Sequence, residues 1–286
     1  MSGMEIRSVG VAGCGTMGAG IAQVVAAAGY PVYVSDVTEE ALERALGLIR
    51  ASLDREVEKG RLTAERREAV LGRIASGTGV EGHADKDLVI EAVFEDMGVK
   101  RDLFGRLDGV CGPSALFATN TSALCVTEMA AATSRPDRFV GLHFFNPAPV
   151  MKLVEVVRTV QTSEEAFQAA WAFIGSLGKE PIASEDRAGF VVDRLLLPYL
   201  MEAVRSLEEG VASVEDIDKG MRLGCGFPMG PFTLMDLIGL DVCYNAATSL
   251  FEEFREKAFL PPPLLKRMVQ AGRLGRKTGR GFYSYE

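Results

Sequence analysis

The chain has 286 residues, of which 48% are hydrophobic and 24% charged, so it is long enough for two domains that each bury a core. Its formal net charge of −8 argues against a nucleic-acid surface, because phosphate binding needs a basic patch. No uncharged apolar run approaches the length that spans a bilayer, and the N-terminus carries no signal-peptide pattern. We therefore expect a cytoplasmic protein with no membrane and no nucleic-acid partner.

The five cysteines are odd in number and widely spaced, and no two of them form a Cys-x-x-Cys pair. The spacing predicts neither a disulfide framework nor a metal site. We expect small, mostly buried thiols at Cys14, Cys111, Cys125, Cys225 and Cys243.

Short runs rich in Val, Ile and Phe alternate with longer helix-like stretches over the first two thirds of the chain. Such alternation indicates crossover connections and a mostly parallel sheet. The expected strands are residues 6–12, 31–36, 87–93, 115–119, 138–145, 152–157 and 180–184.

The last third of the chain shows helical periods only, as in GFVVDRLLLPYLMEAVRSLEEG. A charged, glycine-containing stretch, LGKEPIASEDRAG, lies between these helices and the last expected strand. We therefore predict an α/β domain over residues 1–184 and an all-helical domain over residues 185–286.

A glycine-rich turn follows the first expected strand, in GVAGCGTMGAGIAQ. Gly13, Gly15 and Gly18 permit a tight turn, close approach of the backbone to a pyrophosphate, and close packing of helix on strand. The turn also holds Thr16 and Met17, at the N-terminus of a helix that would face the phosphates. This pattern predicts a dinucleotide site in a Rossmann-type domain.

The second expected strand ends in an acid, Asp36, eighteen residues after Gly18. An acid at this place hydrogen-bonds the ribose hydroxyls and repels a 2′-phosphate, which favours NAD over NADP. The alternative is that Asp36 is a solvated carboxylate that opens the turn SDVTEE.

Two polar clusters follow apolar strands, where ligands of parallel sheets bind: Asn120 to Ser122, and His143 to Asn146. Glu155 interrupts the apolar run LVEVV, and a carboxylate there is costly unless it is paired. An imidazole is a natural partner, because a carboxylate on one ring nitrogen stabilises the imidazolium and lets the other nitrogen act as a general base. That arrangement suits removal of a hydroxyl proton while a hydride leaves the same carbon for a nicotinamide.

The same residues also allow a structural interpretation, in which His143 caps the Asn-Pro turn and Glu155 lies on an edge face. The chain has only one other histidine, His83 in the loop EGHADKD, which we expect to be exposed. If a histidine is the base, His143 is therefore the candidate.

Several segments together resemble the 3-hydroxyacyl-CoA dehydrogenase family, especially bacterial 3-hydroxybutyryl-CoA dehydrogenases. They are GVAGCGTMGAGIAQ, DLVIEAVFED, ATNTSAL, GLHFFNPAPVMKLVEVV, GFVVDRLL, GPFTLMDLIGLDV and GRKTGRGFYSY, which occur in the family's order over nearly the whole chain. The resemblance implies NAD-dependent, reversible oxidation of a short-chain (S)-3-hydroxyacyl-CoA to the 3-keto compound, as in fatty-acid β-oxidation.

The resemblance also implies roles for single residues. His143 would be the base, Glu155 its orienting carboxylate, and Ser122 a hydrogen-bond partner of the substrate oxygen close to the nicotinamide. Further positions that match cofactor contacts of the family are Glu95, Lys100, Asn146 and Lys277. Without the resemblance, Glu95 and Lys100 are interpreted as a solvated charged face and Lys277 as a residue of a flexible tail.

The family inserts a helical hairpin after the second strand, and its first helix contacts coenzyme A. Ser52 and Lys59 match the family's contact pair, and their spacing of seven residues is close to two helical turns. Ser122 is also expected at the acyl-CoA. The alternative for the hairpin is a solvated amphipathic helix.

One position departs from the family pattern. In GFVVDRLL the family usually has asparagine where this chain has Asp193. An ionised aspartate accepts hydrogen bonds but does not donate them, and at the active site its charge would favour the imidazolium form of His143.

Two other functions compete with the acyl-CoA dehydrogenase: a related dehydrogenase of another hydroxy acid, such as a sugar acid, and a non-enzymatic dinucleotide-binding protein. The first would not need the hairpin with Ser52 and Lys59, and the second would not need His143, Glu155 and Ser122. Long apolar faces in LLLPYLMEAV and FTLMDLIGL suggest a subunit interface, so we expect a homodimer through the helical domain, which would also contribute to the substrate pocket.

Overall fold

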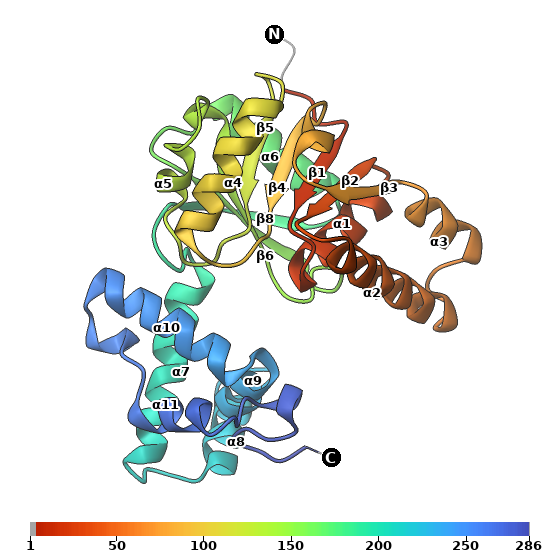
Figure 1. Ribbon diagram of the computed structural model, residues 1–286. Helices are drawn as coiled ribbons and strands as arrows, with labels where there is room; N and C mark the ends of the chain where they lie inside the picture. Colours follow the sequence, from red (N-terminus) through yellow and green to blue (C-terminus); the bar gives the residue numbers. More distant parts are fainter. Residues whose placement is uncertain (1–3, 286) are drawn as a thin grey trace. The chain divides into compact units, whose positions relative to one another are not determined.

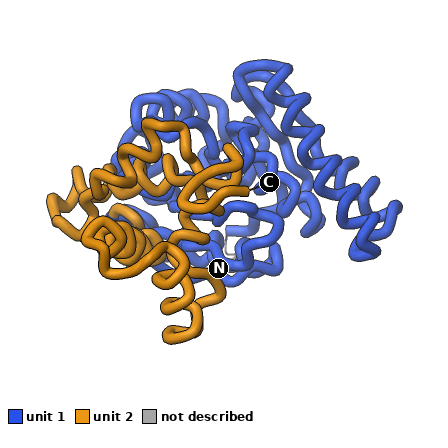
Figure 2. The backbone as a smooth tube through the Cα atoms, turned by 90° about the horizontal axis from the view of Figure 1, so that it is seen from below, with its two compact units in different colours: residues 1–187 blue, residues 188–286 orange. Residues whose placement is uncertain are grey.

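The computed structural model describes residues 4–285 and divides into two compact units. The first unit ends at Arg187 and the second begins at Ala188 (Figure 2). The first unit is an α/β domain and the second contains helices and short turns, as the alternation of patterns along the sequence predicts.

The first unit is built on an eight-stranded sheet in the order β3-β2-β1-β4-β5-β6-β7-β8 (Figure 1). All neighbouring strands are parallel except β6 and β7, which are antiparallel. The mostly parallel Rossmann-type sheet is therefore confirmed. Its strands are β1 (Val9–Ala12), β2 (Val32–Asp36), β3 (Ile74–Thr78), β4 (Leu88–Glu91), β5 (Leu116–Thr119), β6 (Phe139–Phe144), β7 (Leu153–Arg158) and β8 (Glu180–Glu185).

Helices cover both faces of this sheet, so its central strands are buried throughout. On one face, alternate strand residues such as Val11 and Ile90 pack with Ile21 of α1 and Phe173 of α6 in a single core. On the other face, Phe104 of α4 packs edge-on against Phe139 of β6. The helices are α1 (Thr16–Ala27), α2 (Glu39–Glu58), α3 (Ala64–Leu71), α4 (Met97–Val110), α5 (Val126–Ala130) and α6 (Glu164–Ser176).

The sequence did not predict β3, which pairs with β2 at the edge of the sheet. Its sequence, IASGT, contains one large apolar residue, Ile74, and none of its five residues is buried. The strand forms because β2 offers a row of backbone donors and acceptors, and a polar edge strand needs no apolar face.

The second unit consists of five α-helices and two 3₁₀ turns within the described residues. Its C-terminal segment is fixed by Asp236, which is 1% exposed and accepts the backbone N–H groups of Phe282 and Tyr283 at 2.9 Å each. Among residues 4–285, no helix combines the length and apolarity needed to cross a membrane. The helices are α7 (Val192–Glu208), α8 (Val214–Gly224), α9 (Pro231–Ile238), α10 (Leu240–Phe254) and α11 (Pro263–Gln270).

Candidate active site

The glycine-rich turn joins β1 to α1 through contacts that require glycine. Gly13 has a φ of +95°, and a Cβ at Gly18 would lie 1.9 Å from the Gly13 carbonyl oxygen. Gly15 precedes α1 without a side-chain cap, so the first N–H groups of the helix, from Thr16 onward, have no capping side chain. Since these groups carry partial positive charge, the helix end suits a pyrophosphate, with Met17 in the same turn.

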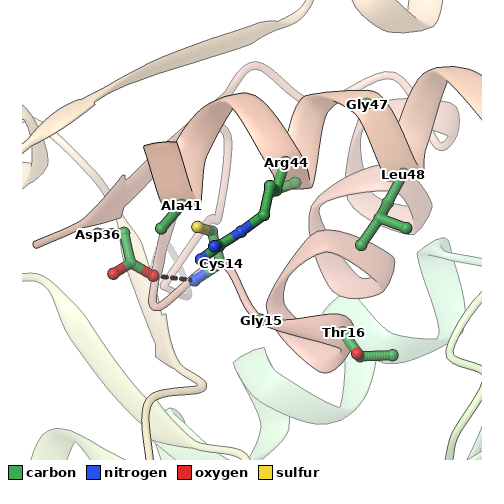
Figure 3. Close-up of a pocket in the computed structure, with 9 residues that line it drawn as sticks. Cys14, Gly15, Thr16, Asp36, Ala41, Arg44, Gly47 and Leu48 are labelled. Atoms are coloured by element: carbon green, nitrogen blue, oxygen red, sulfur yellow. Dashed lines mark hydrogen bonds between the residues drawn. The ribbon is translucent and has the colours of Figure 1, made fainter. Parts of the chain in front are cut away.

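Asp36 ends β2 beside this turn and lines a cavity of about 550 Å³ (Figure 3). Its carboxylate accepts the backbone N–H groups of Cys14 at 2.8 Å and Val37 at 2.7 Å. Burial alone would raise the pKa of Asp36, but these hydrogen bonds and the charge of Arg44 hold that pKa below its ordinary value. Asp36 is therefore an ionised acceptor with lone pairs left for ribose hydroxyls.

A second polar cluster lies where β4 and β5 end. The Lys100 Nζ lies 2.6 Å from Glu91 Oε1 and 3.1 Å from Glu95 Oε2. Lys100 is 1% exposed and Glu91 is fully buried, where the Thr119 hydroxyl also donates to it at 2.6 Å. Burial raises the pKa of Glu91, while Lys100 and Thr119 oppose that rise. The interpretation of Lys100 as part of a solvated face is therefore wrong, because a buried carboxylate holds it.

Hydrogen bonds connect this cluster to the loop that carries Ser122. The Thr121 hydroxyl donates to Glu95, which brings the loop after β4 against the loop after β5. In that second loop, Asn120 Oδ1 accepts the backbone N–H of Phe144 at 2.9 Å and so joins the end of β5 to the end of β6. The structure therefore brings Glu95, Lys100 and Ser122 to the same edge of the sheet as His143.

His143 and Glu155 face each other because β6 and β7 pair with these two residues in register. The His143 Nδ1 lies 2.7 Å from Glu155 Oε2, and the two side chains are 9% and 0% exposed. A carboxylate at this distance orients the imidazole through a hydrogen bond at Nδ1. The predicted pairing is therefore present, and Glu155 does not lie on an exposed edge face.

The loop after β6 carries Asn146, whose side chain is exposed, and then Ala148 to Met151. Lys179 fixes this loop, because its buried Nζ donates to the carbonyl oxygens of Ala148 and Met151 at 2.7 Å each. Burial lowers the pKa of Lys179. The carbonyl contacts position the segment that follows His143.

The helical hairpin implied by the family resemblance is present as α2 and α3, between β2 and β3. Ser52 lies on α2 and is half-buried, and Lys59 ends that helix and is exposed. Arg67 of α3 binds Asp54 of α2 at 2.6 Å and braces the hairpin. Both predicted coenzyme A residues therefore lie on one helix, at its far end from Asp36.

Two predicted site residues belong to the second unit. Asp193 is half-buried in the first turn of α7. Burial raises the pKa of the Cys243 thiol on α10, and the charge of Asp193 adds to that rise. Lys277 Nζ forms an ion pair with Asp241 at 2.6 Å, so it is not part of a flexible tail.

His83 differs from expectation, whereas the cysteines are mostly buried as predicted. His83 is fully buried, and its Nε2 lies 2.7 Å from the Ser35 hydroxyl, so the prediction of an exposed histidine is wrong. The loop EGHADKD forms a 3₁₀ turn that places the ring against Tyr33 and β1. Cys14, Cys111 and Cys243 are buried as predicted, whereas Cys125 and Cys225 are exposed.

Three residues that position the site were not singled out from the sequence. Glu91 interrupts the apolar run DLVIEAV just as Glu155 interrupts LVEVV, so the same reasoning could have found it. Arg44 follows Asp36 at a spacing that places it on the cavity side of α2. No sequence pattern marks Lys179, because the carbonyl groups that it binds come together only in the folded loop.

Two family models cover almost the whole chain. Residues 8–187 match the NAD binding domain of 3-hydroxyacyl-CoA dehydrogenase, and residues 189–285 match its C-terminal domain. The glycine turn, the α1 N-terminus and Asp36 fit this nucleotide, and NAD is the cofactor of this chain.

Curated relatives and solved structures agree with this match. A 3-hydroxybutyryl-CoA dehydrogenase of Mycobacterium tuberculosis is 48% identical over 98% of this chain and 99% of its own length. The crystal structure of FadB2 from the same species has a TM-score of 0.97 at 48% identity and covers 99% of this chain and 100% of that one. The (S)-3-hydroxybutyryl-CoA dehydrogenase PaaH1 of Ralstonia eutropha has a TM-score of 0.94 at 44% identity, with the same coverage.

Proposed function

Because the chain belongs to the 3-hydroxyacyl-CoA dehydrogenase family, we propose that it oxidises a short-chain (S)-3-hydroxyacyl-CoA reversibly to the 3-ketoacyl-CoA. The observation that carries the proposal is the His143–Glu155 pair, 2.7 Å apart at the end of the sheet next to the Ser122 loop. The short acyl chain is supported by relatives of nearly equal length that are named 3-hydroxybutyryl-CoA dehydrogenases.

In this proposal His143 is the general base. Its Nε2 accepts the proton of the 3-hydroxyl group as the hydrogen on the same carbon leaves as a hydride, and Glu155 stabilises the imidazolium that forms. Ser122 donates to the substrate oxygen, whose negative charge increases during proton transfer. NAD, when bound, supplies the hydride acceptor. In the reverse direction, His143 returns the proton to the reduced carbonyl oxygen.

The remaining predicted residues bind and orient the cofactor and the acyl-CoA. The first turn of α1 and Asp36 hold the pyrophosphate and ribose, and the cofactor contacts extend to Glu95, Lys100, Asn146 and Lys277. Ser52 and Lys59 on α2 bind coenzyme A, where the lysine supplies a point charge for phosphate. Asp193 is assigned an accepting role only, because an ionised carboxylate has no proton to donate.

We propose that the enzyme is a cytoplasmic homodimer in which the first unit is the catalytic domain and the helical second unit, from Ala188, serves dimerisation. All five cysteines are free thiols and two are exposed, which is typical of a reducing compartment. Large apolar side chains are exposed on several helices of the second unit, which supports a subunit interface there.

The function is tested by NADH consumption with acetoacetyl-CoA, for the wild type and for His143→Gln. General-base removal should lower kcat by about 10²–10⁴-fold. NADH binding, followed by fluorescence titration, should be unchanged in the variant, because His143 lies on β6 and the nucleotide cavity is lined by the glycine-rich turn, Asp36 of β2 and α2.

The control is Glu155→Gln, which keeps the shape of the pair and should give an intermediate loss of kcat. Asp193→Asn in the same assay should shift the pH–rate profile if the carboxylate charge acts on the base. No turnover in the wild type, with NADH binding intact, would contradict the short-chain acyl-CoA proposal and favour another hydroxy acid or a binding protein.

A further inference from the structure

Helix α2 forms one wall of the nucleotide cavity, and this wall carries the positively charged side chain of Arg44. Ala41, Arg44, Ala45 and Leu48 all line the cavity, since residues spaced by three, four and seven positions share one face of a helix. The opposite wall is the glycine-rich turn with Asp36. Two small residues and a leucine leave room for a flat ring, and Arg44 lies beside that space.

The path of the nucleotide through this cavity follows from two fixed points. The pyrophosphate belongs at the N-terminus of α1, and Asp36 takes the hydroxyls of the adenosine ribose. The adenine must then lie on the far side of Asp36 from α1, which is the α2 wall. A 2′-phosphate, if the ribose carried one, would lie between Asp36 and that wall.

Arg44 extends across the cavity toward Cys14 and Asp36 (Figure 3). It forms no ion pair within 4.0 Å among residues 4–285, unlike Arg61 and Arg67 on the same hairpin, which bind neighbouring carboxylates. It still acts on Asp36 at longer range, because its charge contributes to the lowered pKa of that carboxylate. An exposed arginine without an ion-pair partner, directed into a nucleotide cavity, is available to the ligand.

We propose that Arg44 is the second determinant of cofactor choice: its planar guanidinium stacks on the adenine of NAD, and it can bind the 2′-phosphate of NADP. A guanidinium has both properties, since it stacks on flat rings and forms bidentate hydrogen bonds to phosphate. Asp36 alone then excludes NADP, by placing a negative charge where that phosphate would lie. The pocket therefore attracts the 2′-phosphate of NADP through Arg44 and repels it through Asp36.

The proposal is tested by the dissociation constants of NADH and NADPH, measured by fluorescence titration without acyl-CoA. The variants are Asp36→Asn, Arg44→Leu and the double variant. Asp36→Asn should bind NADPH at least about tenfold more tightly than the wild type, because a like-charge contact is removed. Arg44→Leu should bind NADH about threefold to thirtyfold more weakly, because the stacking cation is lost.

The double variant separates the two roles. It should lose most of the gain in NADPH binding that Asp36→Asn produces, because no cation remains for the 2′-phosphate. The control is Arg50→Leu, an exposed position on α2 that does not line the cavity and should leave both dissociation constants unchanged. Thermal unfolding of each variant shows that it is folded.

Two results would overturn the proposal. If the double variant binds NADPH as tightly as Asp36→Asn, then Arg44 is not the phosphate anchor. If Arg44→Leu binds NADH as tightly as the wild type, then the guanidinium does not stack on the adenine. Both results are dissociation constants and need no turnover. They can therefore be told apart from a failure of the proposed dehydrogenase reaction.

Discussion

The two histidines of this chain are both buried, but their partners differ in charge. His143 lies 2.7 Å from the carboxylate of Glu155, whereas His83 lies 2.7 Å from the neutral hydroxyl of Ser35. Only His143 therefore has a charged partner that orients its ring. Burial lowers the pKa of His83 to about 4.

His83 should make the protein less stable in mild acid. Its pKa is about 4 in the folded protein against an ordinary 6.5, so below pH 6.5 the unfolded chain takes up a proton that the folded protein excludes. Stability is therefore lost as the pH falls from 6.5 toward 4. From about pH 7 to about pH 5, this one group contributes a loss of about 2 kcal/mol.

The measurement is urea unfolding of the wild type and of His83→Gln at both pH values. The variant should be less stable at each pH, but its loss of stability on acidification should be smaller by about 2 kcal/mol. An equal loss in both proteins would show that His83 is not the group responsible.

At the scale of elements, α5 is held by a residue that is distant in sequence. Its N-cap residue, Cys125, makes no side-chain cap, and the carboxylate of Asp186 takes that place. Asp186 accepts the N–H groups of Val126 at 3.1 Å and Thr127 at 2.7 Å, together with the Thr127 hydroxyl at 2.6 Å. Because α5 directly follows the loop with Ser122, Asp186 positions that loop from the end of β8.

Asp186→Asn should loosen this loop, because both carboxylate oxygens accept hydrogen bonds from α5. The amide has one oxygen only, and its NH₂ group would face an N–H or O–H donor of Val126 or Thr127. The expected cost is about 1–3 kcal/mol, seen as a lower thermal midpoint. If the loop positions Ser122, the KM for acetoacetyl-CoA should rise while the dissociation constant of NADH stays the same.

The matched control for this prediction is Glu185→Gln, the exposed last residue of β8 and the chain neighbour of Asp186. It removes the same charge without touching α5 and should change neither the thermal midpoint nor the KM. If Asp186→Asn lowers the thermal midpoint and leaves the KM unchanged, the hydrogen bonds from α5 to Asp186 stabilise the fold but do not position Ser122.

At the scale of the whole molecule, the second unit exposes large apolar side chains on four helices. Leu195 of α7 and Leu223 of α8 are 71% and 72% exposed, and Leu237 of α9 and Val242 of α10 are each 48% exposed. A single exposed leucine is ordinary, but several in one unit of 99 residues suggest a covered surface. A second copy of the chain is the occupant we propose.

Sedimentation should therefore give a mass of twice 30.8 kDa. The double variant Leu195→Lys/Leu223→Lys should raise the dimer dissociation constant at least about tenfold, because two charges would be buried without partners. Val160→Lys, at an 86% exposed position of the first unit, should leave it unchanged. A wild type that sediments at 30.8 kDa would contradict the homodimer.

Local patterns in the sequence were sufficient to predict most of the sheet, the glycine turn and the acid that ends β2. Each depends on neighbours in the chain: alternation of apolar runs, a glycine where φ is positive, a carboxylate at a fixed distance from the turn. The pairing of His143 with Glu155 was also predictable, because a lone carboxylate in an apolar strand requires a partner.

Other features depended on contacts between segments far apart in the chain, and no local pattern encodes those. His83 is buried because β1 and Tyr33 cover a polar loop, and β3 forms because β2 offers it an edge. Asp186 caps a helix 60 residues earlier in the chain. The sequence by itself determined which residue types the site contains, whereas the tertiary structure decided which of them meet, because burial and pairing are set by the packing of the whole domain.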